Sequence, residues 1–511
     1  MKHSRETPRK HSGETTGKRS GEKPPKRSGE TARKPSGEMA GKRSGETPRR
    51  RARGRARHRA HHRIPQRMRH RARHRIRRPR RGSAFAVAAM ITLAAAATPA
   101  AVPSPPSAPS APAAPVRAPA LSANPAYGAA LAPCALAPVK TLQMTEGLPT
   151  GHGYVRSTGT VKALTLMIDF PDVKGQGTAR KRYTEFFPQT SRWFKRSSYG
   201  RLKYRSATPI NHWLRMPHTF RSYGIKRGSP FEPGYRKLVA DIAKAADPHV
   251  DFGRYDLVNV LVTPNAGPPA ARAVLSVTYA DNQRAPVADG VPLANVSFVY
   301  SRQDDGSGTL AQTGYRVLPH ENGHVFGLPD LYTRHGGDSA GHWDVMSEDW
   351  GVGNDLLAWH KWKLGWLGTG QVECIARPGI TRRALSPLGR RGGTKLIFVP
   401  VSKYAGYAVE ARTNKGNDEA VCKAGVLVSW VDTRIDSGQG PITVVDSTPG
   451  SGGCTDEHNV HPGLSDAAFA PGKTFTGGAQ GTGVRVRVTG RDARGDYRVE
   501  ITRYASGGGQ G

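Results

Sequence analysis

The feature that most constrains this chain is the run HENGHVFGLPD, which extends from His320 to Asp330. Its histidines, His320 and His324, are four residues apart, and on an α-helix this spacing places both imidazoles on one face, where they can bind the same metal ion. Proline suits only the first turn of a helix, so Pro319 indicates that the helix either begins close to this point or is kinked. The fold must therefore present a helix with both histidines facing a metal site.

The residues that follow the helix can complete the site. Gly327 can adopt a positive φ, which ends the helix and turns the chain back, so that Asp330 can offer a carboxylate oxygen to the same ion. Two nitrogens and one oxygen leave a fourth position open, which is typical of catalytic rather than structural zinc. Glu321 can take a proton from a zinc-bound water without binding the metal itself. We therefore expect one Zn²⁺ bound by His320, His324 and Asp330, with Glu321 as the catalytic base.

Two other interpretations of the motif fit the sequence less well. Two surface histidines flanking a helical glutamate would also read His-Glu-x-x-His, but they would need neither Gly327 nor Asp330. A non-haem iron site also uses two histidines and one carboxylate, but it would need neither Glu321 nor a methionine turn. Met346 follows the motif closely and suits the tight turn that lies beneath the metal in extended zincin motifs.

The most specific matches to a known family lie at His320–Tyr332, Trp343–Ser347 and Ala358–Leu367. These three segments resemble the immune inhibitor A-like family of secreted bacterial metallopeptidases. Weaker matches follow the family's order at Ala163–Asp172, Ser197–Leu202, Asp251–Asp256, Tyr407–Arg412 and Gly425–Asp432. The resemblance runs from about Val161 to about Asp432 and implies a zincin-like domain, with His320, His324 and Asp330 as zinc ligands and Glu321 as general base. Many relatives carry an acid-rich, calcium-like loop after a Tyr-Asp pair, but Tyr255–Asp256 leads directly into an apolar run, so calcium is not supported.

Residues 161–370 are predicted to form an α/β (α+β) zincin-like catalytic domain. Apolar runs rich in β-formers predict buried strands, and amphipathic runs predict helices. The expected strands are Val161–Phe170, Leu257–Thr263 and Val296–Tyr300, and the expected helices include Tyr183–Phe194, Tyr235–Ala246 and Leu357–Leu364. Residues 300–309 are expected to form a loop, and the domain should close near Thr369 with the active-site helix and the Met346 turn in place.

Residues 371–506 are predicted to form a small β-rich, sandwich-like domain. Short apolar runs separated by glycine and aspartate turns are typical of such a fold. The expected strands are Leu396–Val401, Tyr407–Glu410, Val426–Val431, Val484–Val488 and Tyr497–Thr502. Because Val484–Val488 alternates valine with arginine, one face of that strand should be exposed to solvent.

The head of the chain, residues 1–81, is predicted to be disordered and basic. The chain has 77 basic and 39 acidic residues, a net charge of +38. Residues 1–81 hold 30 of the basic and 6 of the acidic residues, a net charge of +24 that leaves +14 for the other 430 residues. Residues 3–50 are six tandem octads with almost no large apolar residue, so they cannot bury a core. The Arg- and His-rich residues 51–81 would suit a nucleic-acid-binding tail, but no aromatic side chain interleaves them for base stacking, and a cationic segment ahead of an export signal is favoured.

An export signal is predicted at residues 82–101. The apolar run 84–97 is shorter than the roughly 20 residues of a membrane-spanning helix, follows arginines and precedes small residues. We expect cleavage near Ala97 or Ala101, with an uncleaved anchor as the alternative. Export signals rarely begin so far inside a chain, so translation is expected to begin at or near Met68. Residues 102–160 are interpreted as a Pro/Ala-rich linker or pro-segment, whose later part either packs on the enzyme or is cut away.

The four cysteines predict two disulfides, with three possible pairings. Cys422 with Cys454 is preferred, because both lie in the C-terminal region. An alternative makes Cys134 an inhibitory thiolate on the zinc that is released on processing.

Together these features predict a secreted zinc-dependent endopeptidase that acts on proteins or peptides. Each ligand histidine needs a hydrogen-bond partner that fixes its tautomer, and Asp344 is a candidate. The alternative is a secreted zinc-binding or adhesion protein of the same fold without turnover, which the presence of Glu321 disfavours. No nucleic-acid partner in the mature form and no stable membrane anchor are expected, and no oligomeric state is predicted.

Overall fold

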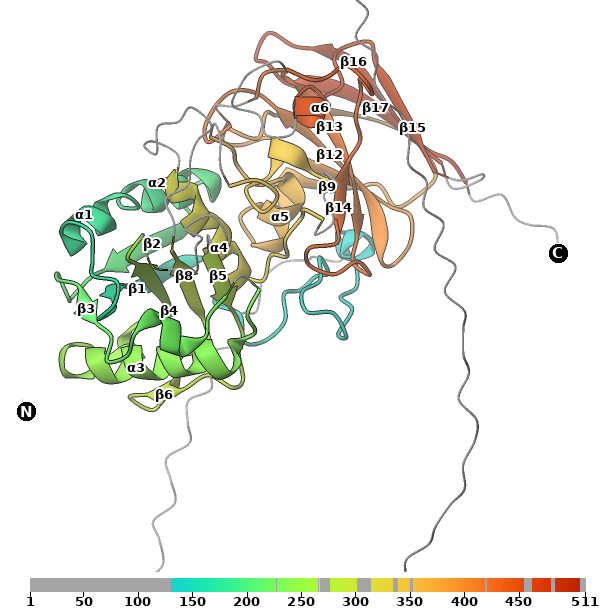
Figure 1. The fold of residues 1–511 in the computed structure, drawn as a ribbon. Coiled ribbons are helices and arrows are strands. Elements are labelled where there is room, and N and C mark those ends of the chain that lie inside the picture. The colour runs from blue at the N-terminus through green and yellow to red at the C-terminus, as the bar shows by residue number, and fades with distance from the viewer. Residues whose placement is uncertain are drawn as a thin grey trace, which may run out of the picture. The chain divides into compact units, whose positions relative to one another are not determined.

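The computed structural model of this chain is a mixed α/β fold with more strand than helix and several sheets (Figure 1). It describes residues 130–505 apart from 227, 265, 267–275, 301–313, 334–338, 350–352, 419–420, 455–461 and 479–482. The predictions for the basic head, the export signal, the start at Met68, residues 102–129 and most of the 300–309 loop lie outside the described residues. Within the described part, no helix has the length and apolar character needed to cross a membrane.

The first sheet carries the amino-terminal half of the described chain. Its strands are β1 (Gly159–Asp169), β2 (Leu202–Ala207), β3 (Leu214–Arg215), β4 (Leu257–Val262), β5 (Ser276–Tyr279) and β8 (Val296–Val299). The order is β2-β1-β4-β8-β5, with β3 also paired to β1, and every pairing is parallel except that of β5 with β8. The predicted strands at 161–170, 257–263 and 296–300 are confirmed.

Both faces of this sheet are buried, which explains the continuous apolar runs of its central strands. Val161, Ala163 and Met167 of β1 belong to one core, while Leu164 and Leu166 point to the other. Helix α3 (Arg236–Ala246) packs in the second core, and α2 (Gln189–Ser197) and α4 (Val317–Val325) pack in the first. Figure 1 shows α3 on the opposite side of the sheet from α2 and α4.

The helix predicted at 183–194 is two helices, which corrects that prediction. Helix α1 (Ala179–Thr184) ends before Pro188, and α2 begins directly after it. Proline has no amide hydrogen to donate and clashes with the preceding turn of a helix, so it suits the start of α2 better than the interior of one long helix. The aromatic side chains of both parts still fill the core, as expected of packing residues.

Two further sheets form the carboxy-terminal region. One has the order β14-β13-β12-β11-β9 and the other β10-β17-β16-β15. The strands are β9 (Val372–Cys374), β10 (Gly379–Leu385), β11 (Leu396–Pro400), β12 (Ala405–Arg412), β13 (Gly425–Asp432), β14 (Ile442–Val444), β15 (Thr474–Gly477), β16 (Val484–Arg491) and β17 (Tyr497–Arg503). Apolar residues of both sheets share one core, and the valines of β16 are buried while its arginines at 485 and 487 are exposed, as the alternation predicted.

The core beside α4 is not confined to one region. It takes in Leu131 and Leu136 from the amino-terminal segment, and Phe398 and Leu427 from the carboxy-terminal sheets. The described residues accordingly belong to one compact unit. The described part of the segment that was interpreted as a linker or pro-segment therefore packs on the rest of the fold.

Both disulfides are formed, one between Cys422 and Cys454 and one between Cys134 and Cys374. The preferred pairing is confirmed. The alternative in which Cys134 is an inhibitory thiolate is wrong for this structure, because its sulfur is bonded to Cys374 and the residue is fully buried.

Candidate metal centre

The two histidines lie on α4, a helix whose described side chains are all buried. Pro319 is its third residue and so lies in the first turn, which resolves the two possibilities in favour of a helix that begins here. Gly327 follows the helix with φ +86°, the left-handed conformation that the sequence required for the return of the chain.

The structure brings the three predicted ligands together. Nε2 of His320 and Nε2 of His324 each lie 3.2 Å from Oδ1 of Asp330. The three ligand atoms all lie within 4.8 Å of one another, and among the described residues these three form the one such group that could hold a metal ion. His320 and His324 are only 7% and 8% exposed, so little solvent reaches the contacts between the ligand atoms.

Each histidine is oriented by a backbone carbonyl. Nδ1 of His320 lies 2.9 Å from the Val345 oxygen, and Nδ1 of His324 lies 2.8 Å from the Leu328 oxygen. A carbonyl can only accept, so Nδ1 must carry the hydrogen and donate it. In a neutral ring this leaves the lone pair on Nε2, directed at the site, as metal-ligating histidines require.

This arrangement fits a cation better than an empty space. Nε2 of each histidine and Oδ1 of Asp330 converge, and among the described residues the buried Oδ1 has no hydrogen-bond donor other than these two imidazoles. Burial lowers the pKa of His320, but the surrounding carboxylates, Asp330 foremost, outweigh it and raise the pKa to about 10. The pKa of Asp330 would rise on burial, yet the two histidines hold it well below its usual range. Surroundings that hold a proton so strongly also favour a metal cation.

Asp330 is held by hydrogen bonds to residues that lie far from it in the sequence. Its amide donates to Oγ of Ser437 at 2.9 Å, and that hydroxyl lies 3.3 Å from Oδ2 of Asp330. The Gly438 amide donates to the Asp330 carbonyl at 3.1 Å. Sequence reasoning missed both residues, because nothing in a Ser-Gly turn more than a hundred positions away marks it as a support for a ligand.

Glu321 lies beside the ligands but outside the ligand group. It is 3% exposed, and its Oε2 accepts a hydrogen bond from Oγ1 of Thr278 at 2.6 Å. Thr278 comes from the antiparallel edge strand β5 and also lies 2.9 Å from Oγ of Ser297. The carboxylate is therefore held at one oxygen, and no hydrogen bond to its other oxygen is found among the described residues, so that oxygen can serve in proton transfer.

The two middle residues of the motif have structural roles. Asn322 donates to Oδ1 of Asn259 at 2.9 Å and accepts from the Tyr204 hydroxyl at 2.6 Å, which fixes α4 to the sheet. Gly323 faces Met346, since a Cβ built there would lie 2.4 Å from its sulfur. The methionine thus lies against the ligand helix where the sequence predicted it.

Asp344 organises the turn around Met346 rather than a ligand histidine, which corrects its predicted role. Its Oδ1 accepts from the Met346 amide and its Oδ2 from the Leu357 amide, both at 2.7 Å. Oδ2 also lies 2.8 Å from Nδ1 of His360. The ligand histidines take backbone carbonyls instead, which sequence patterns cannot specify.

His360, on α5 (Ala358–Lys363), joins this turn to the amino-terminal segment. Its Nε2 lies 2.9 Å from Oε1 of Glu146, and the side chains of His360, Glu146 and Asp344 are 0% exposed. Burial lowers the pKa of His360, but the two carboxylates outweigh it and raise the pKa to about 10.

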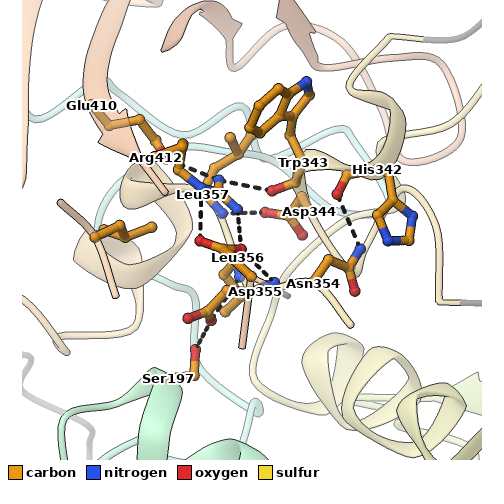
Figure 2. A network of polar contacts seen from close by, with 12 residues as sticks. Ser197, His342, Trp343, Asp344, Asn354, Asp355, Leu356, Leu357, Glu410 and Arg412 are labelled. Carbon is orange, nitrogen blue, oxygen red and sulfur yellow. Dashed lines mark hydrogen bonds and ion pairs between the residues drawn. The ribbon is translucent and has the colours of Figure 1, made fainter. Parts of the chain in front are cut away.

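The carboxy-terminal region contacts the same turn through β12 (Figure 2). The fully buried Arg412 donates to the Trp343 carbonyl at 2.9 Å and pairs with Glu410 at 3.0 Å. Glu410 in turn accepts from the Ala358 amide at 2.7 Å, at the start of α5. Segments far apart in sequence therefore hold the turn around Met346, which packs against the ligand helix.

No protein-family model matches the chain, and no curated protein matches it either. The chemical interpretation of the site thus depends on its own geometry.

Proposed function

We propose that this protein is a secreted zinc-dependent endopeptidase with a zincin-like catalytic domain, similar to the immune inhibitor A-like family. The observation that carries the proposal is the convergence of Nε2 of His320, Nε2 of His324 and Oδ1 of Asp330, with Glu321 held beside them. A structural zinc site would use four protein ligands, whereas the ligand group found among the described residues has three.

The donor set favours zinc. Two imidazoles and one carboxylate suit zinc or iron, but an iron site has no need for the Glu321–Thr278 contact or for Met346 beneath the helix. When bound, zinc polarises a scissile carbonyl and lowers the pKa of coordinated water to about 7.

Glu321 is the candidate for the general base. Thr278 holds its Oε2, which limits rotation of the carboxylate. We propose that Glu321 accepts a proton from the attacking water and passes it to the leaving amine, which completes hydrolysis of a peptide bond. The backbone carbonyls that hold His320 and His324 keep the ligand nitrogens directed at the site throughout.

Secretion is supported by the cysteines. Both disulfides join parts of the fold that are far apart in sequence, with separations of 240 and 32 residues. Such bridges persist in oxidising compartments and are rare in the cytosol.

The proposal is tested by zinc content and hydrolysis of an unstructured protein substrate, measured for the parent and for Glu321→Gln. Glutamine keeps an oxygen for Thr278 but cannot accept the proton. We expect about one zinc per chain in both and hydrolysis by the parent alone. Glu232→Gln, at a partly exposed position away from the ligands, is the matched control and should behave as the parent. Zinc in both without hydrolysis by either would favour the zinc-binding or adhesion alternative, and absence of zinc from the parent would refute the ligand assignment.

A further inference from the structure

The loop Thr433–Pro441, between β13 and β14, holds the third ligand of the site. Its Ser437 accepts the Asp330 amide at 2.9 Å and lies 3.3 Å from Oδ2, while its Gly438 amide donates to the Asp330 carbonyl at 3.1 Å. The backbone of Asp330 is thus fixed on both sides, and its carboxylate has one oxygen occupied. The other oxygen, Oδ1, faces the two histidines.

The same loop also contacts the residues that follow Asp330 in the sequence. Gln439 forms an antiparallel bridge with Thr333. Gly440 has φ +74°, and a Cβ built there would lie 2.4 Å from Oγ of Ser339, so only glycine permits this approach. Ser437 itself is 5% exposed, which shields its contacts with Asp330 from water.

The loop is anchored in turn by the amino-terminal segment. The Asp436 carboxylate accepts from the amides of Gln143 and Met144, each at 3.1 Å. Thr433 completes the connection, since its hydroxyl donates to the Ala137 carbonyl at 2.7 Å and its carbonyl accepts from Thr145 at 2.8 Å. Residues 137–145, this loop and Asp330 therefore form one continuous chain of contacts.

We infer that Ser437 is a positioning residue for the metal ligand Asp330, and that residues 137–145 support metal binding through the loop that carries it. The inference rests on the proposed metal site. Without the hydroxyl, Oδ2 loses its contact with Ser437, and the carboxylate is held less firmly in the orientation that points Oδ1 at the histidines. Such outer partners of metal ligands typically contribute 10–100-fold to metal affinity.

The first experiment compares Ser437→Ala with Ser451→Ala in the full chain. Ser451 is a matched control, because its hydroxyl also donates to an aspartate, Asp466, at 3.0 Å but away from the ligands. Zinc dissociation constants are measured by competition with a chromophoric chelator, and the visible spectrum of the Co²⁺-substituted protein reports ligand geometry. We expect Ser437→Ala to raise the dissociation constant about 10–100-fold and to alter the Co²⁺ spectrum, with Ser451→Ala unchanged.

Circular dichroism and thermal unfolding of the metal-free proteins separate positioning from misfolding. If Ser437→Ala folds as the parent does and binds zinc with the same affinity and the same Co²⁺ spectrum, the inference is overturned while the proposed function stands. If the parent itself binds no zinc, both are overturned.

The second experiment tests the role of residues 137–145 with Thr433→Val, which removes the hydrogen bond to the Ala137 carbonyl and leaves the side chains of Asp436 and Ser437 in place. We expect zinc affinity to fall by a smaller factor than in Ser437→Ala, and limited proteolysis within 137–145 to become faster. Faster proteolysis with unchanged zinc affinity would contradict the connection between this segment and Asp330.

Discussion

Gly323→Ala tests the contact between the ligand helix and the methionine beneath it. A Cβ at this position would lie 2.4 Å from the Met346 sulfur and 3.1 Å from its methyl carbon. Met346 is fully buried, and its backbone is held by the Asp344 carboxylate and the Leu331 amide. The backbone of Met346 is therefore fixed, and its side chain has no solvent to move into.

Two opposing effects decide the magnitude. Alanine favours a helix interior over glycine by about 1 kcal/mol. Overpacking a well-filled core costs about 1–3 kcal/mol, and the full burial of Met346 means that its flexible thioether can move only by displacing other core atoms. The free energy of unfolding should therefore fall by up to about 2 kcal/mol, and zinc affinity should fall with it because both ligand histidines share this helix.

Denaturant unfolding of the metal-free protein and a zinc competition titration measure both effects. Gly463→Ala is the control, since no atom lies within 4 Å of a Cβ built there. In a Met346→Ala background the clash is gone, so Gly323→Ala should become neutral or stabilising. Equal stability and equal zinc affinity of Gly323→Ala and the parent would refute the packing argument.

Three further predictions follow from the same contacts. Thr278→Val should retain zinc but lower kcat roughly tenfold, since the partner of Glu321 is lost; unchanged kinetics would contradict this. Because the pKa of His360 is raised from 6.5 to about 10, its stabilisation is full below pH 6.5 and lost as the pH rises to 10. Unfolding free energies across that interval should therefore fall more steeply for the parent than for His360→Gln, and equal slopes would count against the ion pairs. Loop-closure entropy predicts a loss of about 5 kcal/mol on removing the Cys134–Cys374 bridge and about 4 kcal/mol for Cys422–Cys454, which unfolding of the paired serine variants measures; the reverse order would contradict it.

The parts of the site that sequence could predict are those encoded locally. The spacing of His320 and His324, the turn at Gly327 and the return to Asp330 all lie within one short run, and the structure brings the three ligands together. Buried strands such as β1 and β4 were predicted because short continuous apolar runs are typical of strands that are buried on both faces of a parallel sheet.

The parts that sequence could not predict depend on distant contacts. Ser437 lies 107 positions from Asp330, and Thr278 lies 43 positions from Glu321, so no local pattern marks either. Asp344 was a candidate partner for a ligand histidine, but the structure uses the backbone carbonyls of Val345 and Leu328 instead, and a backbone carbonyl leaves no side-chain signal in the sequence. Strand β2 was not predicted, although its alternation of buried Leu202 and Tyr204 with exposed charged residues is the pattern of a half-buried strand.

The central claim is that His320, His324 and Asp330 hold one zinc ion. Its most direct test is the zinc K-edge X-ray absorption spectrum of the full chain loaded with one equivalent of zinc, recorded beside His324→Gln. We predict scattering from two imidazoles and no sulfur in the parent, and from one imidazole with weaker binding in the variant. An identical spectrum and affinity in both, or sulfur ligands in the parent, would contradict the assignment of this site.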